Sequence, residues 1–383
     1  MTTLAALPPK GVAVLGSTGS IGTTALRVLD RQRERFRVTA LTANSNGALL
    51  REQVLRFSPS FVGMVESQTA ADDGWKRGTD ALITAATRDD VDIVLNAIVG
   101  AAGLDATLAA LKGGKRVALA NKETLVIAGD LVRQACSSGS GELVPVDSEH
   151  SAILQCITGH PTSQVRRVVL TASGGPFRDW SAERLATATV DDALRHPTWR
   201  MGRKISIDSA TLANKALEVI EAHFLFGLPY ESIDVVVHPQ SVVHSFVEFI
   251  DGSVVAQMSI PTMELPVLYA LTHPERVADN GVPAFDPVKL SPMTYEPVNH
   301  ERFPALRLGI AAGIAGGAAP AVFNAANECA VAAFLGGKIR FADIPRGISS
   351  ALDKLGTLSG TTREDLLAAD AAARHHVQEV FGC

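Results

Sequence analysis

The segment at residues 11–31 constrains the fold of this chain more than any other. The apolar run GVAVL, typical of a buried strand, is followed by the turn GSTGSIG and by a helical stretch at residues 23–31. A strand, a glycine-rich turn and a helix in this order are typical of a phosphate-binding turn, because glycines let the backbone approach a pyrophosphate at a helix N-terminus. The spacing GxxGxxG is a variant of GxGxxG and is a weak signal by itself.

The same alternation of strand and helix continues to residue 150 and strengthens that interpretation. Short apolar runs predict buried parallel strands at residues 36–42, 60–65, 92–97, 116–120 and 143–146, and helical stretches separate them. The pattern predicts a doubly wound α/β domain, Rossmann-like, over residues 1–150. Ligands of such domains bind beyond the carboxyl ends of the strands.

The turns that follow these strand ends carry the candidate ligand contacts. They are Thr18, Gly19, Ser20 and Ile21 in the glycine turn, then Asn44, Ser45 and Asn46, residues 98–100, Asn121, Lys122 and Glu123, and finally Asp147, Ser148 and Glu149. Five strand ends directed at one crevice predict a binding site there.

The turn after the second strand bears on the choice of cofactor. An NAD site usually has an acidic residue there to hold the ribose hydroxyls. This chain has the neutral Asn44, Ser45 and Asn46, which tolerate a 2′-phosphate, so the sequence favours NADP over NAD. The turn contains no Lys or Arg, although Arg51 could reach it from the following helix.

Residues 202–221, GRKISIDSATLANKALEVIE, carry a second cluster of polar side chains. Apolar residues at helical spacing predict a helix over residues 212–224. Asn214, Lys215 and Glu218 share the face away from that apolar stripe, and Ser209 lies one turn earlier, near the expected helix start. A hydroxyl, an amide and an ammonium suit a phosphate. The alternative is a solvated helix face with an intrahelical Lys215–Glu218 pair.

Three carboxylates predict a metal site. Asp147 and Glu149 are two residues apart, so on an extended segment they would point the same way. Together with Glu218 they suit a hard divalent cation such as Mg2+ or Mn2+. The alternative is that Asp147 and Glu149 form the acidic start of a helix at residues 150–157.

The rest of the chain predicts two further domains and a connection. We expect a catalytic and dimerisation domain at residues 151–285, a connection at 286–303 and a helical domain at 304–383, with helices at 321–335, 342–355 and 363–381. In the middle domain, Ser173 lies in a glycine turn suited to an anion. Strands are expected at 233–237, 242–250 and 253–258, with a hairpin at Asp251-Gly252 and a plausible dimerisation edge. Trp199, in the loop at residues 196–202, is either a core residue or part of a lid.

The composition excludes several classes of protein. The 383 residues are 46% hydrophobic, enough for two or three domains with real cores, and the net charge of −5 gives no basic footprint for nucleic acid. No apolar run reaches about 18 residues, and MTTLAALPPK is not a charged-then-apolar leader, so we expect a cytoplasmic protein without membrane segments. The four cysteines, Cys136, Cys156, Cys329 and Cys383, lack zinc, haem or disulfide spacing and are expected to be ordinary thiols.

Seven segments together carry a resemblance to a known family. In order, GSTGSIG, NAIVGAAGL, ALANKE, VDSEHSAI, SGGPFR, HPTWRMGRKISIDSATLANKALEVIEA and NAANE resemble the 1-deoxy-D-xylulose 5-phosphate reductoisomerase family, over essentially the whole chain. The resemblance implies a V-shaped homodimeric enzyme of the non-mevalonate isoprenoid pathway. Such an enzyme converts 1-deoxy-D-xylulose 5-phosphate into 2-C-methyl-D-erythritol 4-phosphate with NADPH and Mg2+, Mn2+ or Co2+.

The resemblance also implies a role for each matching residue. The metal ligands would be Asp147, Glu149 and Glu218; the phosphate contacts Ser173, Ser209, Asn214 and Lys215; the other substrate contacts Lys122, Ser148 and His196; and the lid Trp199 and Met201. The cofactor contacts would be Thr18, Gly19, Ser20, Ile21, Asn44, Ser45, Asn46, Asn121, Glu123 and Gly202. Lys122, Asp147, Glu149, His196 and Glu218 are the candidate catalytic residues.

Two rival functions and one departure from the family pattern remain. Many relatives have a basic residue in the turn after the second strand, and its replacement here by Asn44-Ser45-Asn46 bears on NADPH selectivity, not on activity. A simple NADP-dependent dehydrogenase of a phosphorylated small molecule, with a nucleophilic Cys, is one rival, and a non-catalytic NADP-sensing module is the other. The three carboxylates argue against both. The sequence does not distinguish a retroaldol route from a ketol shift.

Overall fold

The computed structural model describes residues 8–66, 74–199 and 201–382 and divides into two compact units. The first comprises Met1–Thr124, Val132–Asp147 and Thr262–Pro283, and the second comprises Leu125–Leu131, Ser148–Pro261 and Ala284–Cys383. The start of the expected N-terminal tail, Arg200 in the expected lid, and Cys383 lie outside the described residues. Within the described ranges, no helix combines the length and apolar character needed to span a bilayer.

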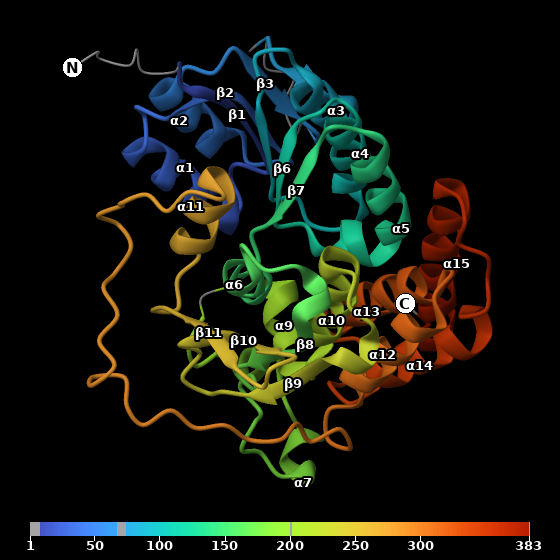
Figure 1. Ribbon diagram of the computed structural model, residues 1–383. Coiled ribbons are helices and arrows are strands. Elements are labelled where there is room, and N and C mark those ends of the chain that lie inside the picture. Colours follow the sequence, from blue (N-terminus) through green and yellow to red (C-terminus); the bar gives the residue numbers. More distant parts are fainter. Residues whose placement is uncertain (1–7, 67–73, 200, 383) are drawn as a thin grey trace. The chain divides into compact units, whose positions relative to one another are not determined.

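The first unit is built on a parallel sheet, which in the described residues has seven strands in the order β4-β3-β2-β1-β5-β6-β7 (Figure 1). The strands are β1 (Lys10–Leu15), β2 (Phe36–Ala43), β3 (Phe61–Met64), β4 (Lys76–Arg77), β5 (Ile93–Asn96), β6 (Arg116–Leu119) and β7 (Glu142–Pro145). The order reverses between β1 and β5, which is the switch point where doubly wound folds bind ligands. The expected α/β, Rossmann-like fold is therefore confirmed.

The six predicted strands of this sheet are all present, with ends within one residue of the prediction. They were recognisable because strands that are covered on both faces are continuous apolar runs; Val12, Val14 and Leu95, for example, are fully buried. The two-residue strand β4 was not predicted, since two residues carry no periodicity. The helices are α1 (Ser20–Arg31), α2 (Gly47–Phe57), α3 (Asp80–Thr87), α4 (Leu104–Lys112), α5 (Lys122–Ser138) and α11 (Glu264–Thr272), with a 3-10 turn at Ala101–Gly103.

The segment Thr262–Pro283 returns to the first unit after an excursion through the second. Its helix α11 packs against α1. Ion pairs fix the contact, because Arg31 Nε donates to Asp279 Oδ1 at 2.7 Å and Arg31 also pairs with Glu264. The Asp279 side chain is fully buried, whereas the Arg31 side chain is 29% exposed, so the pair lies at the edge of the contact.

The second unit contains a smaller sheet, which in the described residues has four strands in the order β11-β10-β8-β9. The strands are β8 (Val165–Ala172), β9 (Ile233–Val237), β10 (Val243–Phe249) and β11 (Val254–Met258); β10 is antiparallel to β8 and β11, and β8 is parallel to β9. The helices α6 (Ser148–Ile157) and α10 (Ala213–Phe226) bury Ile153 and Val219 in one core with Leu170 and Val247 of the sheet.

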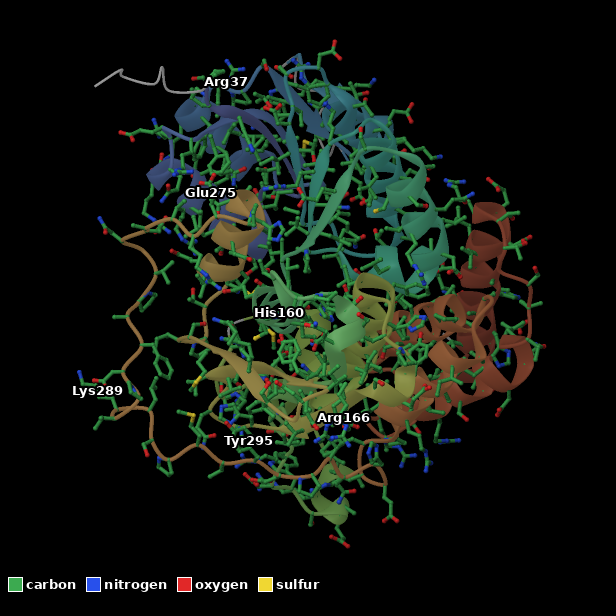
Figure 2. All side chains as sticks on the ribbon, viewed as in Figure 1. Arg37, His160, Arg166, Glu275, Lys289 and Tyr295 are labelled. Atoms are coloured by element: carbon green, nitrogen blue, oxygen red, sulfur yellow. The ribbon has the colours of Figure 1, made fainter. Side chains whose placement is uncertain are left out.

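The three predicted strands of this sheet and their hairpin are confirmed. Gly252 has φ +85°, and Asp251 Oδ1 accepts a hydrogen bond from the Ser253 amide at 2.9 Å. Strand β8 was not predicted, because Arg166 and Arg167 interrupt its apolar pattern. Both arginines are exposed and pair with Glu248 on the neighbouring strand; Figure 2 labels Arg166.

The helix predicted at residues 212–224 is present as α10 (Ala213–Phe226), but a second helix that was not predicted directly precedes it. Helix α9 (Arg203–Thr211) ends before Leu212, which has φ +60°, and α10 begins at Ala213. Ser209 therefore lies in the last turn of α9, and the prediction that it sits near a helix start is wrong. A non-glycine residue rarely adopts this left-handed conformation, so no sequence pattern announced the break.

The remaining helices lie in the second unit. They are α7 (Ala182–Leu185), α8 (Val190–Leu194), α12 (Pro304–Ala315), α13 (Ala319–Leu335), α14 (Asp343–Leu355) and α15 (Arg363–Phe381), with 3-10 turns at Thr162–Gln164 and Tyr230–Ser232. The three predicted C-terminal helices match α13, α14 and α15, which pack on one another. The irregular connection before α12 is held to the sheet by a Val237–Glu296 bridge and by Tyr295, whose ring stacks on His238 at 4.7 Å (Figure 2).

The glycine turn of the first unit is shaped by close backbone approach. Gly16 has φ +77°. A Cβ at Gly22 would lie 2.3 Å from the Gly16 carbonyl oxygen and 2.6 Å from the Ser17 Cα. Only glycine allows α1 to start this close to the end of β1, and this confirms the steric reasoning behind the motif.

We expect Gly22→Ala to destabilise the first unit by about 1–3 kcal/mol, because its methyl group meets backbone that cannot move aside. The measurement is urea unfolding followed by circular dichroism. The control is Gly47→Ala, whose Cβ would meet only the flexible Met64 side chain at 3.4 Å or more and the edge of Trp75 at 4.0 Å. Equal stability of the two variants would show that the turn can relax.

Candidate functional site

The glycine turn presents backbone amides at the start of α1. Gly19 is the N-cap residue, and among the described residues no side chain caps this helix. Beneath the turn, the Ser17 hydroxyl donates to Gln53 Oε1 at 2.7 Å, and Gln53 Nε2 donates to the Ser17 carbonyl at 2.9 Å. The buried pair fixes the turn from below, while Gly19 and Ser20 lie exposed above it. A helix N-terminus in this state attracts anions.

The turn after β2 is exposed and neutral, as the sequence indicated. Asn46 is the N-cap of α2, and its Oδ1 accepts a hydrogen bond from the Leu49 amide at 3.2 Å. The Asn44 carbonyl accepts one from the Glu66 amide at 2.8 Å. Asn44, Ser45 and Asn46 therefore form an ordered, solvent-facing corner at the carboxyl edge of the sheet.

Asn121 and Glu123 are buried in a hydrogen-bond network that was not predicted. Asn121 Nδ2 donates to the carbonyls of Ile98 and Gly100, at 2.9 and 3.0 Å, and to Glu123 Oε2 at 2.8 Å. The network ties the turn after β5 to the end of β6. The structure thus gives both side chains a structural role, whatever their contact with a ligand.

Lys122 and Asp147 form an ion pair within the first unit. Lys122 Nζ donates to Asp147 Oδ2 at 2.7 Å, and the lysine side chain is 8% exposed. Asp147 is the last residue of this unit and is bonded directly to Ser148, the first residue of α6.

The three predicted metal ligands converge, although the local structure differs from the expected one. Glu149 lies in the first turn of α6, so the prediction that Asp147 and Glu149 share an extended segment is wrong. One carboxylate oxygen each from Asp147, Glu149 and Glu218 nevertheless lies within 4.8 Å of the others. The helix begins at residue 148 and not at 150, which turns Glu149 toward α10.

Lys215 bridges two carboxylates of this cluster, Glu149 and Glu218. Its Nζ donates to Glu149 Oε1 at 2.8 Å, to the Thr171 carbonyl at 2.5 Å and to Glu218 Oε2. Asn214 Nδ2 also donates to Glu218, through Oε1. The Lys215 and Glu218 side chains are 4% and 2% exposed, which rules out the alternative of a solvated helix face.

The charge of Lys215 is firmly held. Burial alone would lower the pKa of its ammonium, but the charges of Glu149 and Glu218 and their hydrogen bonds outweigh burial and raise the pKa above its ordinary value. The lysine therefore carries a positive charge between the two carboxylates and offsets their mutual repulsion.

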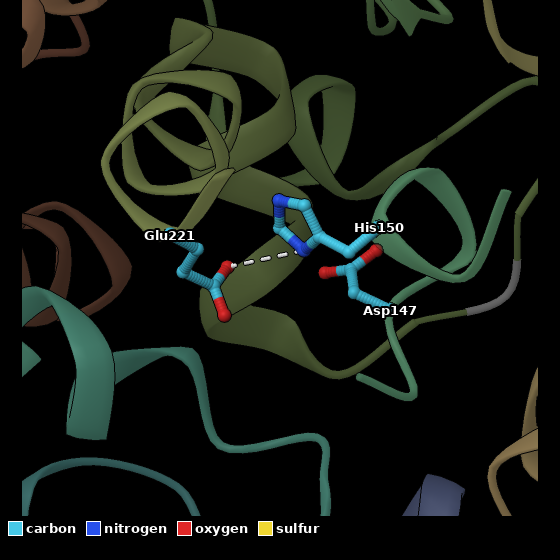
Figure 3. A group of neighbouring side chains, drawn as sticks. All are labelled: Asp147, His150 and Glu221. Atoms are coloured by element: carbon cyan, nitrogen blue, oxygen red, sulfur yellow. Dashed lines mark ion pairs between the residues drawn. The ribbon is translucent and has the colours of Figure 1, made fainter. Parts of the chain in front are cut away.

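Sequence reasoning missed two residues of this cluster, His150 and Glu221. A second group of ligand atoms, from Asp147, His150 and Glu221, also lies within 4.8 Å (Figure 3). His150 Nε2 lies 2.9 Å from the Glu218 carbonyl, which can only accept, so Nε2 carries the proton and Nδ1 faces Glu221 at 3.9 Å. The available signal was spacing, since Glu221 is three residues after Glu218 on one helix face.

The expected phosphate contacts are brought together by a glycine. Ser173 Oγ lies 2.9 Å from His196 Nε2 and accepts a hydrogen bond from the Gly175 amide at 3.2 Å. A Cβ at Gly175, where φ is +67°, would lie 2.8 Å from the Ser209 carbonyl oxygen. The glycine turn and the last turn of α9 are thus in direct backbone contact, with Lys215 bonded to Thr171 two residues before Ser173.

His196 organises the loop that contains Trp199. Its Nδ1 accepts hydrogen bonds from the backbone amides of Thr198, at 3.1 Å, and Trp199, at 2.9 Å, so the proton of the neutral ring lies on Nε2 and points to Ser173. Trp199 is half-buried, and its ring centroid lies 6.4 Å from that of His244. Met201 and Gly202 follow, with Gly202 as the N-cap residue of α9.

Three family models match this chain and together cover most of it. They describe 1-deoxy-D-xylulose 5-phosphate reductoisomerase (residues 12–129), its C-terminal domain (residues 143–226) and the DXP reductoisomerase C-terminal domain (residues 258–376). A 1-deoxy-D-xylulose 5-phosphate reductoisomerase from Synechococcus sp. is 49% identical over 382 residues, which are 97% of each chain. This chain belongs to the 1-deoxy-D-xylulose 5-phosphate reductoisomerase family.

Solved structures of the family have the same fold. The 1-deoxy-D-xylulose 5-phosphate reductoisomerase of Zymomonas mobilis in complex with NADPH superposes with a TM-score of 0.90 at 44% identity, over 97% of this chain and 99% of that one. A DOX-P reductoisomerase in complex with NADPH, fosmidomycin and magnesium gives a TM-score of 0.92 at 38% identity, over 97% and 98%. The family assignment from the sequence is confirmed.

We expect the His196 ring to be less than about one tenth protonated at pH 6, because burial lowers its pKa to about 4; a ring with the ordinary pKa near 6.5 would be roughly three quarters protonated. NMR of the ring, assigned with His196→Asn, measures this directly. A ring that titrates near pH 6.5 would contradict the structure.

The lowered pKa of His196 also predicts that the folded protein loses stability as the pH falls. Below pH of about 6.5 the unfolded chain takes up a proton at His196 before the folded protein does, so this residue's contribution to the free energy of unfolding falls between pH of about 7 and 4. Urea unfolding of His196→Asn should therefore depend less on pH in this window than unfolding of the unsubstituted protein.

Proposed function

We propose that this protein isomerises and reduces 1-deoxy-D-xylulose 5-phosphate to 2-C-methyl-D-erythritol 4-phosphate, using NADPH and a divalent metal. Family membership at 49% identity supports the activity. The observation that carries the proposal is the set of three carboxylates with one oxygen each within 4.8 Å, two of which, Glu149 and Glu218, are bridged by the buried Lys215. A dehydrogenase or a sensing module does not require that arrangement.

The first unit would bind NADPH. The uncapped start of α1 and the glycine turn suit the pyrophosphate, through Thr18, Gly19, Ser20 and Ile21. The corner at Asn44, Ser45 and Asn46 suits the adenosine ribose. Asn121, Glu123 and Gly202 complete the proposed cofactor contacts, with Asn121 acting mainly by holding the turn after β5 in place.

Asp147, Glu149 and Glu218 would hold the metal. Carboxylate oxygens are the ligands that Mg2+ and Mn2+ prefer, and Co2+ also accepts them, so the donor set fits the group. When bound, such an ion supplies Lewis-acid stabilisation of charge that develops on adjacent substrate oxygens. Lys122 would hold Asp147 in position from the other side through their 2.7 Å ion pair.

The substrate phosphate would lie among Ser173, Ser209, Asn214 and Lys215. The Ser173 turn and the end of α9 are already in backbone contact, and α10 supplies the amide and the ammonium. Because Lys215 is engaged with Glu149 and Glu218, we infer that it exchanges one of these bonds for the phosphate when the carboxylates gain another cation. Ser148 and His196 would contact the rest of the substrate, while Trp199 and Met201 would close over it and exclude water.

The proposed assembly is a homodimer in the cytoplasm, without nucleic-acid or membrane partners. The open edge strand β11 supports a dimer surface, since Val254 and Val255 are 57% and 42% exposed on it. Edge strands with exposed apolar residues pair readily with a second chain. The dehydrogenase alternative gains no support from the thiols: Cys156 is buried, and burial raises the pKa of Cys136, which disfavours the nucleophilic thiolate.

The first test is NADPH oxidation with 1-deoxy-D-xylulose 5-phosphate, with and without Mn2+. Turnover should require the metal, and Asp147→Asn should reduce it by more than about 100-fold, since even the partners of metal ligands contribute 10- to 100-fold. NADPH binding should be unchanged. Asp353→Asn, at an exposed position of α14, is the control. Near-normal turnover of Asp147→Asn at low Mn2+ would refute the metal assignment.

The second test concerns Lys215. Lys215→Met keeps the length of the side chain but leaves Glu149 and Glu218 without their counter-charge, so unfolding in metal-free buffer should cost about 3 kcal/mol less. Mn2+ should restore much of that loss, because it neutralises the same carboxylates. Substrate capture should weaken about 10- to 100-fold. Lys289→Met, at an exposed position, should change none of these. A loss of stability that Mn2+ leaves untouched would separate Lys215 from the metal site.

A further inference from the structure

Two arginines flank one tryptophan at the corner of the first unit. The guanidinium carbon of Arg51 lies 5.4 Å from the Trp75 ring centroid, and that of Arg77 lies 5.6 Å from it. Arg51 is exposed on α2, while Trp75 and Arg77 are half-buried. Both guanidinium groups are within the range of a cation–π contact, which restricts their orientations. The sequence indicated only that Arg51 could reach the turn at residues 44–46, and it predicted neither Trp75 nor Arg77 as its neighbours.

The cluster lies at the carboxyl edge of the sheet, where ligands of this fold bind. In the ladder, Ala43 at the end of β2 pairs with Met64 of β3, and Met64 pairs with Arg77 of β4. Arg77 Nη1 lies 3.0 Å from Met64 Sδ, and the Gly78 amide donates to the Met64 carbonyl at 3.1 Å. Arg77 is therefore level with the residue that precedes Asn44.

Trp75 packs against the start of α2. A Cβ on Gly47 would lie 4.0 Å from Trp75 Cζ3, and Gly47 directly follows Asn46. Arg51 is one turn further along α2, on the same helix face as Gly47. The tryptophan, both arginines and the turn at residues 44–46 thus surround one corner, and all of them belong to the first unit.

The turn after the second strand of this fold is where a dinucleotide-binding domain distinguishes the 2′-hydroxyl of NAD from the 2′-phosphate of NADP. The turn itself contributes neutral Asn44, Ser45 and Asn46. The turn has no positively charged residue, and Arg51 of α2 and Arg77 of β4 supply two permanent positive charges beside it. Arginine suits the task, because its planar donors bind phosphate oxygens in pairs and its charge does not depend on pH.

We propose that Arg51 and Arg77, oriented by Trp75, recognise the 2′-phosphate of NADPH and determine the cofactor specificity of this protein. The proposal rests on the proposed NADPH-dependent function. It assigns to α2 and β4 a role that the sequence placed in the turn at residues 44–46.

The experiment measures dissociation constants of NADPH and NADH by nicotinamide fluorescence, with neither metal nor substrate present. Arg51→Gln and Arg77→Gln should each weaken NADPH binding about 5- to 20-fold and the double variant more, whereas the dissociation constant of NADH should stay within about twofold. Trp75→Leu should lose part of the preference, because the arginines lose the surface that orients them. Rising salt should weaken NADPH more steeply in the unsubstituted protein than in the double variant.

Arg56→Gln is the matched control. Arg56 is in the last turn of the same helix and pairs with Asp30, so its loss should leave both dissociation constants unchanged. Equal weakening of NADPH and NADH by the arginine variants would reduce the cluster to surface packing, and unchanged NADPH binding would overturn the proposal. A lower dissociation constant for NADH than for NADPH in the unsubstituted protein would also overturn the proposal.

These binding measurements are separable from the proposed catalytic function. A protein whose NADPH preference depends on Arg51 and Arg77, but which fails to oxidise NADPH with 1-deoxy-D-xylulose 5-phosphate and Mn2+, would refute the function and keep the specificity assignment. Normal turnover of the unsubstituted protein, together with unchanged NADPH binding in the double variant, would support the proposed function and refute the specificity assignment.

Discussion

The buried ammonium of Lys215 is the interaction around which the second unit is organised. It joins three elements that are far apart in the sequence, since its partners lie on α6, at the end of β8 and on α10 itself. Burying one cation among carboxylates is favourable only when its donors are satisfied, and here all three ammonium hydrogens have an acceptor. The fold of the sheet and its two helices therefore depends on the charge balance at the site.

That dependence has a chemical side. Three neighbouring carboxylates repel one another until a cation neutralises them. A lysine can supply that positive charge when no metal ion is bound and can give up its contacts when one binds. Held by Glu149 and Glu218, the ammonium neutralises two of the three carboxylates that are the proposed metal ligands. Lys215 would thus both stabilise the second unit and take part in the exchange of ligands.

The sequence predicted the first unit well because parallel strands buried on both faces are continuous apolar runs, as in β1 and β5. It failed where three-dimensional context decides. In strand β8 the adjacent Arg166 and Arg167 interrupt the apolar run, so the strand could not be told from a loop. The left-handed conformation of Leu212, which separates α9 from α10, has no signature in residue type. The carboxylates were found because Asp147 and Glu149 follow a strand end and Glu218 lies on the polar face of a predicted helix, although Glu149 reaches the cluster from a helix and not from an extended segment. The roles of His150 and Glu221 depend on a contact between α6 and α10 that one sequence does not encode locally.

The contact between Gly175 and the Ser209 carbonyl has a consequence for how this enzyme family can change. Because the backbone at Gly175 closely approaches the backbone of Ser209, the main chain sets the spacing between the Ser173 turn and the last turn of α9. Under the proposed function, substitutions at Ser173 or Ser209 would change the groups offered to the substrate phosphate while that spacing stays fixed. A site with this property can become tolerant of a competing phosphonate, or accept a modified sugar, through side-chain substitutions that leave the backbone unchanged. Replacing Gly175 would change the spacing itself, since a methyl group there would push the Ser173 turn and the last turn of α9 apart.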